Sequence, residues 1–437
     1  NIRPGLGYLG STLNDAAAKY LEFVFSVTDT ALLELTNLAL RVWVSDAVVT
    51  RTAVSTAITN GTFTTDVASW TDADDAGGVS SWVAPGYMQL LGNGTAAAAR
   101  TQTVAVTGAD IGVEHALNIV IARGPVTLRV GSAAGLDDYI TETALGEGSH
   151  SLTLTPTGNM FIRLQSTLKR VVWVDSIEID SAGAMQLTSP YPAAALSLIR
   201  HAASGDIVFL ACSGYQQYKI ERRATRGWSV VKYLADAGPF MVQNISPTTM
   251  TPSVLSGNGT LTASKAYFKS TNVGSLFSHT STGQRVTGSV TVENTFTSAI
   301  EITGTGTDRT ATINISGTFV ATVVLQRSFD SSTGPWADVA TKTYTLPTVE
   351  GYVDGLDNQT VWYRLGTKTG DYTSGTADMI LSIPTGSIRG IARVTAYTST
   401  TVVDIEVLTE FGSTSASDVW QEGTWSDRRG WPSAVAF

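Results

Sequence analysis

The sequence predicts an all-β protein built from several small β-domains along one polypeptide. Alternating or β-branched runs of about four to eight residues dominate the chain, and clusters of Gly, Asn, Asp and Ser separate them. The hydrophobic fraction of 43% with 15% charged residues is ordinary for a folded protein. A chain of 437 residues also exceeds the size at which one hydrophobic core stops growing, so its length predicts two to four domains.

Residues 1–50 and 184–250 are predicted to form a β-rich base domain. Leu33 and Leu35, then Leu40 and Val42, alternate around a Thr36-Asn37 turn, which predicts a hairpin although the composition favours a helix. Pro192 is predicted to open a short helix that ends at His201. A three-strand meander is expected to follow, with strands at Asp206–Cys212, Gln217–Arg222 and Trp228–Leu234.

Residues 51–183 read as a self-contained antiparallel sandwich. Its strands are evenly spaced, as in small sandwiches and barrels. We expect them at 102–106, 115–121, 126–130, 151–154, 161–164 and 171–179.

Residues 311–382 form a second compact set whose size and spacing suit an immunoglobulin-like or fibronectin-like sandwich. Tyr363 then takes the position where such folds favour a tyrosine. The expected strands are 319–327, 336–339, 352–354 and 361–365, and a hairpin of 388–397 with 401–408 follows them. Asn60-Gly61, Asn93-Gly94 and Asn258-Gly259 are predicted to be turns, because both residue types tolerate positive φ.

Charge and cysteine usage exclude some classes of function. A formal net charge of −9 disfavours a dedicated nucleic-acid or anionic-membrane binder, yet it suits a wall that DNA passes without sticking. The single cysteine, Cys212, excludes an internal disulfide and a cysteine-based zinc site, and its apolar context predicts a buried strand residue rather than a reactive thiol. We expect no cofactor. The sequence begins at Asn1 and stops at Phe437 within a predicted strand, so we expect a piece of a longer chain.

No catalytic constellation stands out in the sequence. The four histidines are scattered, and neither a nucleophile elbow nor a phosphate-binding loop is present, so we expect a protein that is not an enzyme. Asp72, Asp74 and Asp75 form an acidic cluster that lacks the EF-hand pattern, and a solvated turn explains it better than a calcium site.

Two groups of aromatic residues are candidate binding surfaces. Trp70, Trp82 and Tyr87 flank the start of the first sandwich and are candidate glycan contacts, with core packing as the alternative. The terminal run from 420 to 431 combines tryptophan and arginine, which dominate interface energetics, and predicts a packing or partner-contact motif. Its candidate residues are Trp420, Trp425, Arg428, Arg429 and Trp431.

The terminal run 420–437 resembles a segment of the tail nozzle proteins of short-tailed bacteriophages, also called tail tubular protein B. Supporting stretches are 3–10 with 23–26, 38–44, the meander with its Arg222 and Trp228, 272–277 and 386–394. In that family the terminal segment leads into further β-rich sequence, so 414–437 is expected to begin a propeller-like region.

The resemblance covers the chain apart from residues 51–183, which read as an insertion. This insertion resembles the galactose-binding-like jelly-roll sandwich of carbohydrate-binding modules, on Asn60–Phe63, Trp70, Gln102–Val104 and Val174–Ile179. Such modules often hold a structural calcium near their joined termini, which makes Asp175 a weak calcium candidate. Similarly, Gly317–Ile383 is expected to interrupt a small β-barrel formed by 251–310 and 383–413.

The resemblance implies a homo-oligomeric ring in the virion, six-fold in this family, which forms the DNA conduit of the tail. Its partners would be the portal and adaptor above it, tail-fibre proteins, and genomic DNA that passes without specific binding. An alternative hypothesis is a virion adhesin that binds a host-surface glycan through the inserted sandwich, and a third is a polysaccharide-degrading enzyme.

Overall fold

The computed structural model describes residues 8–26 and 29–426 and divides the chain into two compact units. The first unit comprises Asn1–Pro239, Ser270–Ser275 and Thr424–Phe437, and the second comprises Phe240–Lys269 and Leu276–Gly423. Nearly all regular structure is strand, which confirms the all-β prediction. In the described residues the helical elements are 3-10 turns: η1 (Leu13–Asp15), η2 (Ala193–Leu198), η3 (Ser270–Asn272) and η4 (Gly306–Arg309).

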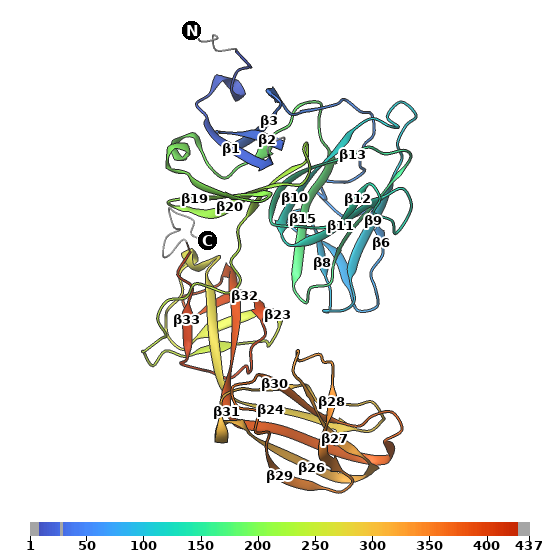
Figure 1. The fold of residues 1–437 in the computed structure, drawn as a ribbon, viewed down its shortest axis with the longest axis vertical. Coiled ribbons are helices and arrows are strands. Elements are labelled where there is room, and N and C mark those ends of the chain that lie inside the picture. Colours follow the sequence, from blue (N-terminus) through green and yellow to red (C-terminus); the bar gives the residue numbers. More distant parts are fainter. Residues whose placement is uncertain (1–7, 27–28, 427–437) are drawn as a thin grey trace. The chain divides into compact units, whose positions relative to one another are not determined.

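The first unit is organised around one nine-stranded sheet (Figure 1). In spatial order its strands are β18 (Arg200–Ser204), β19 (Ile207–Cys212), β20 (Tyr215–Arg222), β21 (Trp228–Lys232), β13 (Gly148–Leu154), β10 (His115–Arg123), β15 (Val171–Ile179), β8 (Tyr87–Leu91) and β7 (Val79–Val83). A second sheet holds β12 (Ile140–Leu145), β11 (Val126–Gly131), β14 (Met160–Ser166), β9 (Ala98–Val104) and β6 (Thr71–Asp72). A third holds β1 (Lys19–Ser26), β2 (Asp29–Thr36), β3 (Ala39–Val44), β4 (Ala47–Val48) and β17 (Leu187–Thr188), and β5 (Thr50–Arg51) pairs with β16 (Gly183–Ala184).

The nine-stranded sheet is covered on opposite faces at its two ends. On β13, Leu152 belongs to the core of the inserted sandwich. Its neighbour Ser151 pairs with Trp228 of β21, and Trp228 belongs to the core under β1–β3. Because side chains alternate across a strand, the two cores lie on opposite faces of one sheet. The chain enters and leaves the insertion near residues 51 and 183, but the sheet of the insertion continues into the base meander through the β13–β21 pair.

The predicted elements of this unit were largely found. The hairpin around Thr36-Asn37 is confirmed as β2 and β3, with Thr36 opposite Ala39. The meander is confirmed as β19, β20 and β21. The helix predicted from Pro192 to His201 is wrong in length and type. It is a 3-10 turn of six residues, and Arg200 already starts β18.

The second unit has two hydrophobic cores that share long strands. Its eight-stranded sheet contains β22 (Met250–Pro252), β23 (Gly257–Ala263), β32 (Val402–Thr409), β31 (Tyr372–Tyr397), β24 (Leu276–Val290), β33 (Trp420–Glu422), β26 (Thr310–Ala321) and β29 (Thr348–Val353). A four-stranded sheet contains β25 (Ile300–Ile302), β30 (Val361–Gly366), β27 (Val323–Ser328) and β28 (Ala337–Tyr344).

Two strands run through both parts of this unit, and a bulge between Thr282 and Gln284 shifts their pairing register (Figure 1). β24 has 15 residues and β31 has 26, and they pair from Leu276 opposite Arg393 to Val290 opposite Ala377. One end of the pair contributes to a core that contains Phe277 and Val394, and the other contributes to a core that contains Val290 and Met379. The sandwich around 311–382 therefore also takes in the second half of β24 and all of β25.

Two predicted details of this unit are wrong. The strand expected at 319–327 is two strands, because the chain leaves one sheet after Ala321 and enters the other at Val323. Asn258-Gly259 is not a turn but lies inside β23, and the positive φ falls on Gly257 instead. Gly259 is needed for space, since a Cβ there would stand 2.4 Å from a methyl group of Val254.

Candidate functional site

The structure buries Trp70 in a core and holds the other two predicted glycan contacts, Trp82 and Tyr87, against neighbouring residues. Trp70 is 3% exposed and packs edge-to-face on Phe63, and its indole N–H donates to the Asn60 carbonyl at 3.1 Å. Trp82 is 36% exposed, but its indole N–H is tied to the Phe63 carbonyl at 2.7 Å. These two rings fix the loop that precedes the insertion's strands.

Tyr87 belongs to a stack of planar groups on the outer face of β8, β15 and β10. Its ring is parallel to that of Trp173, with the centroids 5.5 Å apart. The Arg123 guanidinium lies 4.0 Å from the centre of the Trp173 ring, and Gln89 accepts the Trp173 indole N–H at 3.1 Å. Trp173 is therefore covered by Tyr87 and Arg123.

Asp175 lies in β15 of the inserted sandwich. It is the extra residue of a β-bulge, because Val174 pairs with Ile121 while Ser176 pairs with Val120. Burial raises the pKa of Asp175, and a hydrogen bond with Ser176 opposes that rise. Among the described residues, no group of three or more His, Cys, Asp or Glu side chains is placed to hold a metal ion.

The joined termini of the insertion are bridged by a guanidinium. Arg51, at the entrance, donates to Asp180 at 3.3 Å, to Ser151 at 2.6 Å and to the Arg226 carbonyl at 2.9 Å. Asn118 donates to the other oxygen of Asp180 at 3.2 Å. A positive charge from the chain itself thus lies where the resemblance implied calcium.

The acidic cluster forms structural hydrogen bonds. Asp74 accepts the Ser80 N–H at 2.7 Å and the Ala99 N–H at 2.6 Å, and Asp75 accepts the Ala97 N–H at 3.0 Å. Asp74 therefore links β7 to β9.

The described part of the terminal motif is a packing element. Trp420 is 5% exposed, its ring centroid lies 5.0 Å from that of Tyr267, and its indole N–H donates to the Thr248 carbonyl at 2.8 Å. Trp425 is half-buried. Arg428, Arg429 and Trp431 lie outside the described residues.

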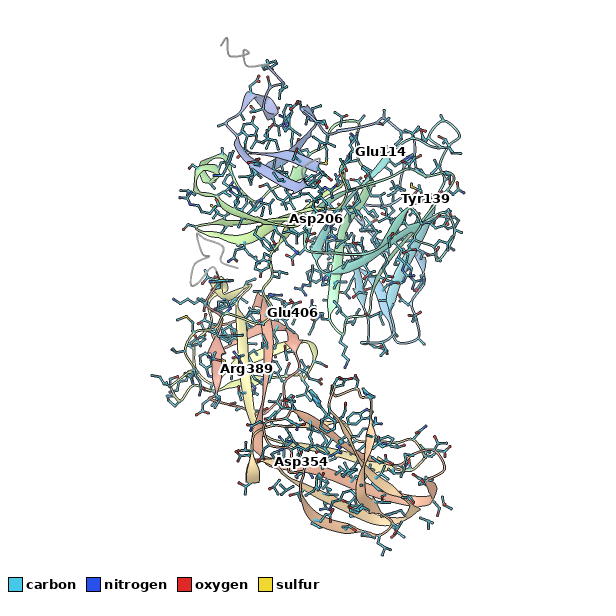
Figure 2. The ribbon with its side chains drawn as sticks, viewed as in Figure 1. Glu114, Tyr139, Asp206, Asp354, Arg389 and Glu406 are labelled. Atoms are coloured by element: carbon cyan, nitrogen blue, oxygen red, sulfur yellow. The ribbon has the colours of Figure 1, made fainter. Side chains whose placement is uncertain are left out.

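Sequence reasoning missed a groove along β12, an edge strand of its sheet. The groove has a volume of about 410 Å³, and its lining includes Tyr139, Thr141, Glu142, Thr153 and Arg223. Figure 2 shows Tyr139 on the inserted sandwich, at the start of β12. Leu152 and Thr153 of β13 also line the groove.

The polar groups of this groove are held in place by neighbours. Arg223 donates to the Thr143 hydroxyl and the Ala144 carbonyl, both at 3.2 Å, and to Glu221 at 2.5 Å. The Tyr139 hydroxyl accepts the Thr157 N–H at 3.0 Å and lies 3.0 Å from the Thr157 hydroxyl. No motif marks these residues in the sequence, because Tyr139 and Arg223 come from segments predicted to belong to different domains.

A larger hollow of about 670 Å³ lies in the second unit, between Gly283 of β24 and Ser413. None of the described residues that line it is aromatic. Its Gln284 amide is used internally, since it accepts the Glu301 N–H at 2.7 Å and donates to the Glu301 carbonyl at 2.5 Å. It offers fewer groups for recognition than the groove along β12.

The buried titratable side chains serve the fold. Cys212 is buried in β19, as predicted, and burial raises the pKa of its thiol. His150 is a buried residue of β13 opposite Ser229 of β21, and its ring nitrogens lie 2.8 Å from the Ser229 hydroxyl and 2.9 Å from the Gly146 carbonyl oxygen. Tyr363, predicted at a special position of the sandwich, donates to Asp354 at 2.7 Å.

Comparisons with known proteins leave the chain without an assigned family. No protein-family model matches it, and no curated protein does. Among solved structures, it has a likeness to the crystal structure of an IolB-like protein from Salmonella typhimurium LT2, at 7% identity and a TM-score of 0.12. That match covers 66% of this chain and 83% of the other, and a TM-score this low supports no conclusion on fold or function. Within the described residues, no helix has the length and apolar character that crossing a bilayer requires.

Proposed function

We propose that this chain is a non-enzymatic structural component of a bacteriophage tail, a subunit of the nozzle ring that conducts DNA and anchors fibres. The observation that carries the proposal is the role of the segment that resembles the nozzle family. Trp420, the first residue of that segment, closes a core of the second unit, and β33 adds to β24 opposite Phe277–His279. Because this segment completes a hydrophobic core, its role is structural.

The continuous strands of the second unit support the same role. Because β24 and β31 are paired on both sides of a bulge between Thr282 and Gln284, a pull along them is distributed over two ladders of backbone hydrogen bonds. A tail component that transmits force between neighbouring parts of a virion needs such continuity.

The charge of the chain fits a DNA conduit. A formal net charge of −9, repeated around a ring of copies, repels the phosphate backbone and lets DNA pass without specific binding. A closed ring requires heterologous interfaces, and the multi-domain chain has outer strands that other subunits, portal, adaptor or fibre proteins can contact.

Quantitative mass spectrometry of purified particles tests this proposal. Particles of the phage that encodes this chain are expected to contain it at six copies, or a multiple of six, for each portal ring. Its absence from particles, or a copy number that matches the fibres instead, would refute the nozzle assignment.

A further inference from the structure

The hollow between β24 and Ser413 in the second unit has no assigned role, and we propose that it binds the phosphate group of a small organic phosphate ester through Arg285. This inference goes beyond the structural role proposed above and does not depend on ring assembly. It rests on a guanidinium that has no partner, on the hydroxyl groups beside it, and on the ordered loop that forms one wall of the hollow.

Arg285 projects from the outer face of the sandwich sheet. Its neighbours on β24 face inward, since Gln284 is 7% exposed and Val286 packs against the core of the sandwich. Because side chains alternate across a strand, the Arg285 side chain lies on the other face, where it is exposed. Among the described residues it has neither a hydrogen bond nor an ion pair. Its donors are therefore available to a ligand, whereas Arg223 in the groove along β12 is paired with Glu221.

Two hydroxyl side chains lie in the same cross-strand row as Arg285. Arg285 is opposite Ser382 of β31, and Ser382 is opposite Thr312 of β26 on its other side. Residues directly opposite each other in antiparallel strands have their side chains on one face, about 5 Å apart. The row continues to Gly351 of β29, which has no side chain to crowd Thr312. The guanidinium is thus followed along the sheet by two groups that can donate hydrogen bonds.

The facing wall of the hollow is a loop that is held against the sheet. It begins at Phe411, which is 2% exposed and belongs to a core of the second unit. Gly412 lies so close to β24 that a Cβ there would stand 2.4 Å from the Ser281 hydroxyl oxygen. The Ser413 hydroxyl accepts the Ser415 N–H at 2.9 Å, which leaves its own proton to donate to a ligand. A wall that is already ordered loses little entropy when a ligand binds.

The composition of the lining favours an anion. The described lining residues include one guanidinium and four hydroxyl side chains but no Asp or Glu. A guanidinium matches the geometry of phosphate oxygens, and hydroxyl groups can donate to the oxygens that it leaves unpaired. The lining has no carboxylate that would compete for Arg285 or repel a phosphate.

The size of the hollow indicates an ester rather than a bare phosphate ion. Its volume of about 670 Å³ lies in the range of sites that hold small organic ligands. Leu255, which is 41% exposed, also lines the hollow and offers an apolar contact to the organic group.

Saturation-transfer NMR on the whole chain tests the proposal, with AMP and phenyl phosphate as probes and with adenosine and phenol as their uncharged counterparts. At least one ester should show transfer from the protein, with an affinity that titration then measures. Its uncharged counterpart should bind at least about tenfold more weakly, because it lacks the group that Arg285 binds. Arg285→Gln should weaken binding of the ester about tenfold or more for the same reason.

Two further variants separate the hollow from general electrostatic attraction and from misfolding. Lys265→Gln removes an exposed positive charge of the second unit outside the hollow and should leave the affinity within about twofold of the parent chain. Thr414→Phe places a bulky ring at an exposed position of the lining, so it should block binding while the thermal unfolding midpoint stays unchanged.

Several results would overturn the assignment. They are absence of transfer for both esters, binding of an uncharged counterpart as tight as that of its ester, binding that survives Arg285→Gln or Thr414→Phe, and an equal loss of binding in Lys265→Gln. Because the test uses the isolated chain, its failure would leave the proposed role in the tail unaffected.

Discussion

Asp354→Asn is expected to destabilise the sandwich of the second unit strongly. Asp354 and Arg309 both have fully buried side chains and form a two-pronged ion pair, with both N–O distances 2.7 Å. Burial by itself raises the pKa of Asp354, but hydrogen bonds from Arg309, the Leu356 N–H and Tyr363 outweigh it and hold the pKa below its usual value. The Asn replacement removes the carboxylate that pairs directly with the buried Arg309 guanidinium.

Loss of one partner from a buried ion pair costs about 3–5 kcal/mol. With a urea dependence of about 2 kcal/mol per molar, the unfolding midpoint of this sandwich should fall by about 2 M. Hydrogen exchange of peptides from β26 and β30, measured across a urea series, reads this midpoint without interference from the first unit.

Two comparisons make the Asp354 result decisive. Asp330→Asn changes an exposed carboxylate of the same sandwich and should alter stability by no more than about 0.5 kcal/mol. The double change Arg309→Met with Asp354→Leu removes both charges and should recover most of the loss. A midpoint shift for Asp354→Asn no larger than that of Asp330→Asn would refute the reasoning.

Three further predictions concern other buried groups. Burial lowers the pKa of His150 to about 4, so the contribution of the neutral imidazole to stability is complete above the unfolded pKa of about 6.5 and is lost as the pH falls from there to about 4. His150→Gln should therefore reduce the pH dependence of the unfolding free energy between these two values. An unchanged pH dependence would contradict this prediction. Hydrogen bonds from Ser55 and Thr56 outweigh burial and lower the pKa of Asp110 to about 2, so a carboxyl NMR titration should find its midpoint near that value rather than at 3.8. Trp420→Ala should destabilise the second unit by about 3–5 kcal/mol, seen as faster hydrogen exchange in β24 and β33, and unchanged exchange would contradict its packing role.

Local features of the fold were predictable because they depend on neighbours in the chain. Alternation gave β10 and β15 closely, since the period of two survives wherever one face is buried. The hairpin of β2 and β3 also places Glu34 opposite Arg41, so the buried pair these residues form follows from the predicted turn.

The sharing of sheets and strands was not predictable from local pattern. The pairing of Ser151 with Trp228 joins segments assigned to separate domains, and nothing in either strand encodes the partner. The same holds for β31, whose 26 residues read as the end of one domain and the start of another.

The aromatic residues show why composition alone does not locate a binding surface. Composition identified Trp70, but a sandwich buries most of its aromatic residues, and Trp70 is in the core. The sequence did not indicate the groove that contains Tyr139 and Arg223, because its lining comes from two segments, the β12 edge and the β20–β21 turn, that come together only in the folded chain.

Image reconstruction of the assembled phage tail tests the central claim most directly. The account predicts a six-fold ring below the portal, and both units of this chain, including the paired β24 and β31, should fit its density. Density for the chain only at the tip of a fibre, or a tail ring that accepts neither unit, would contradict it.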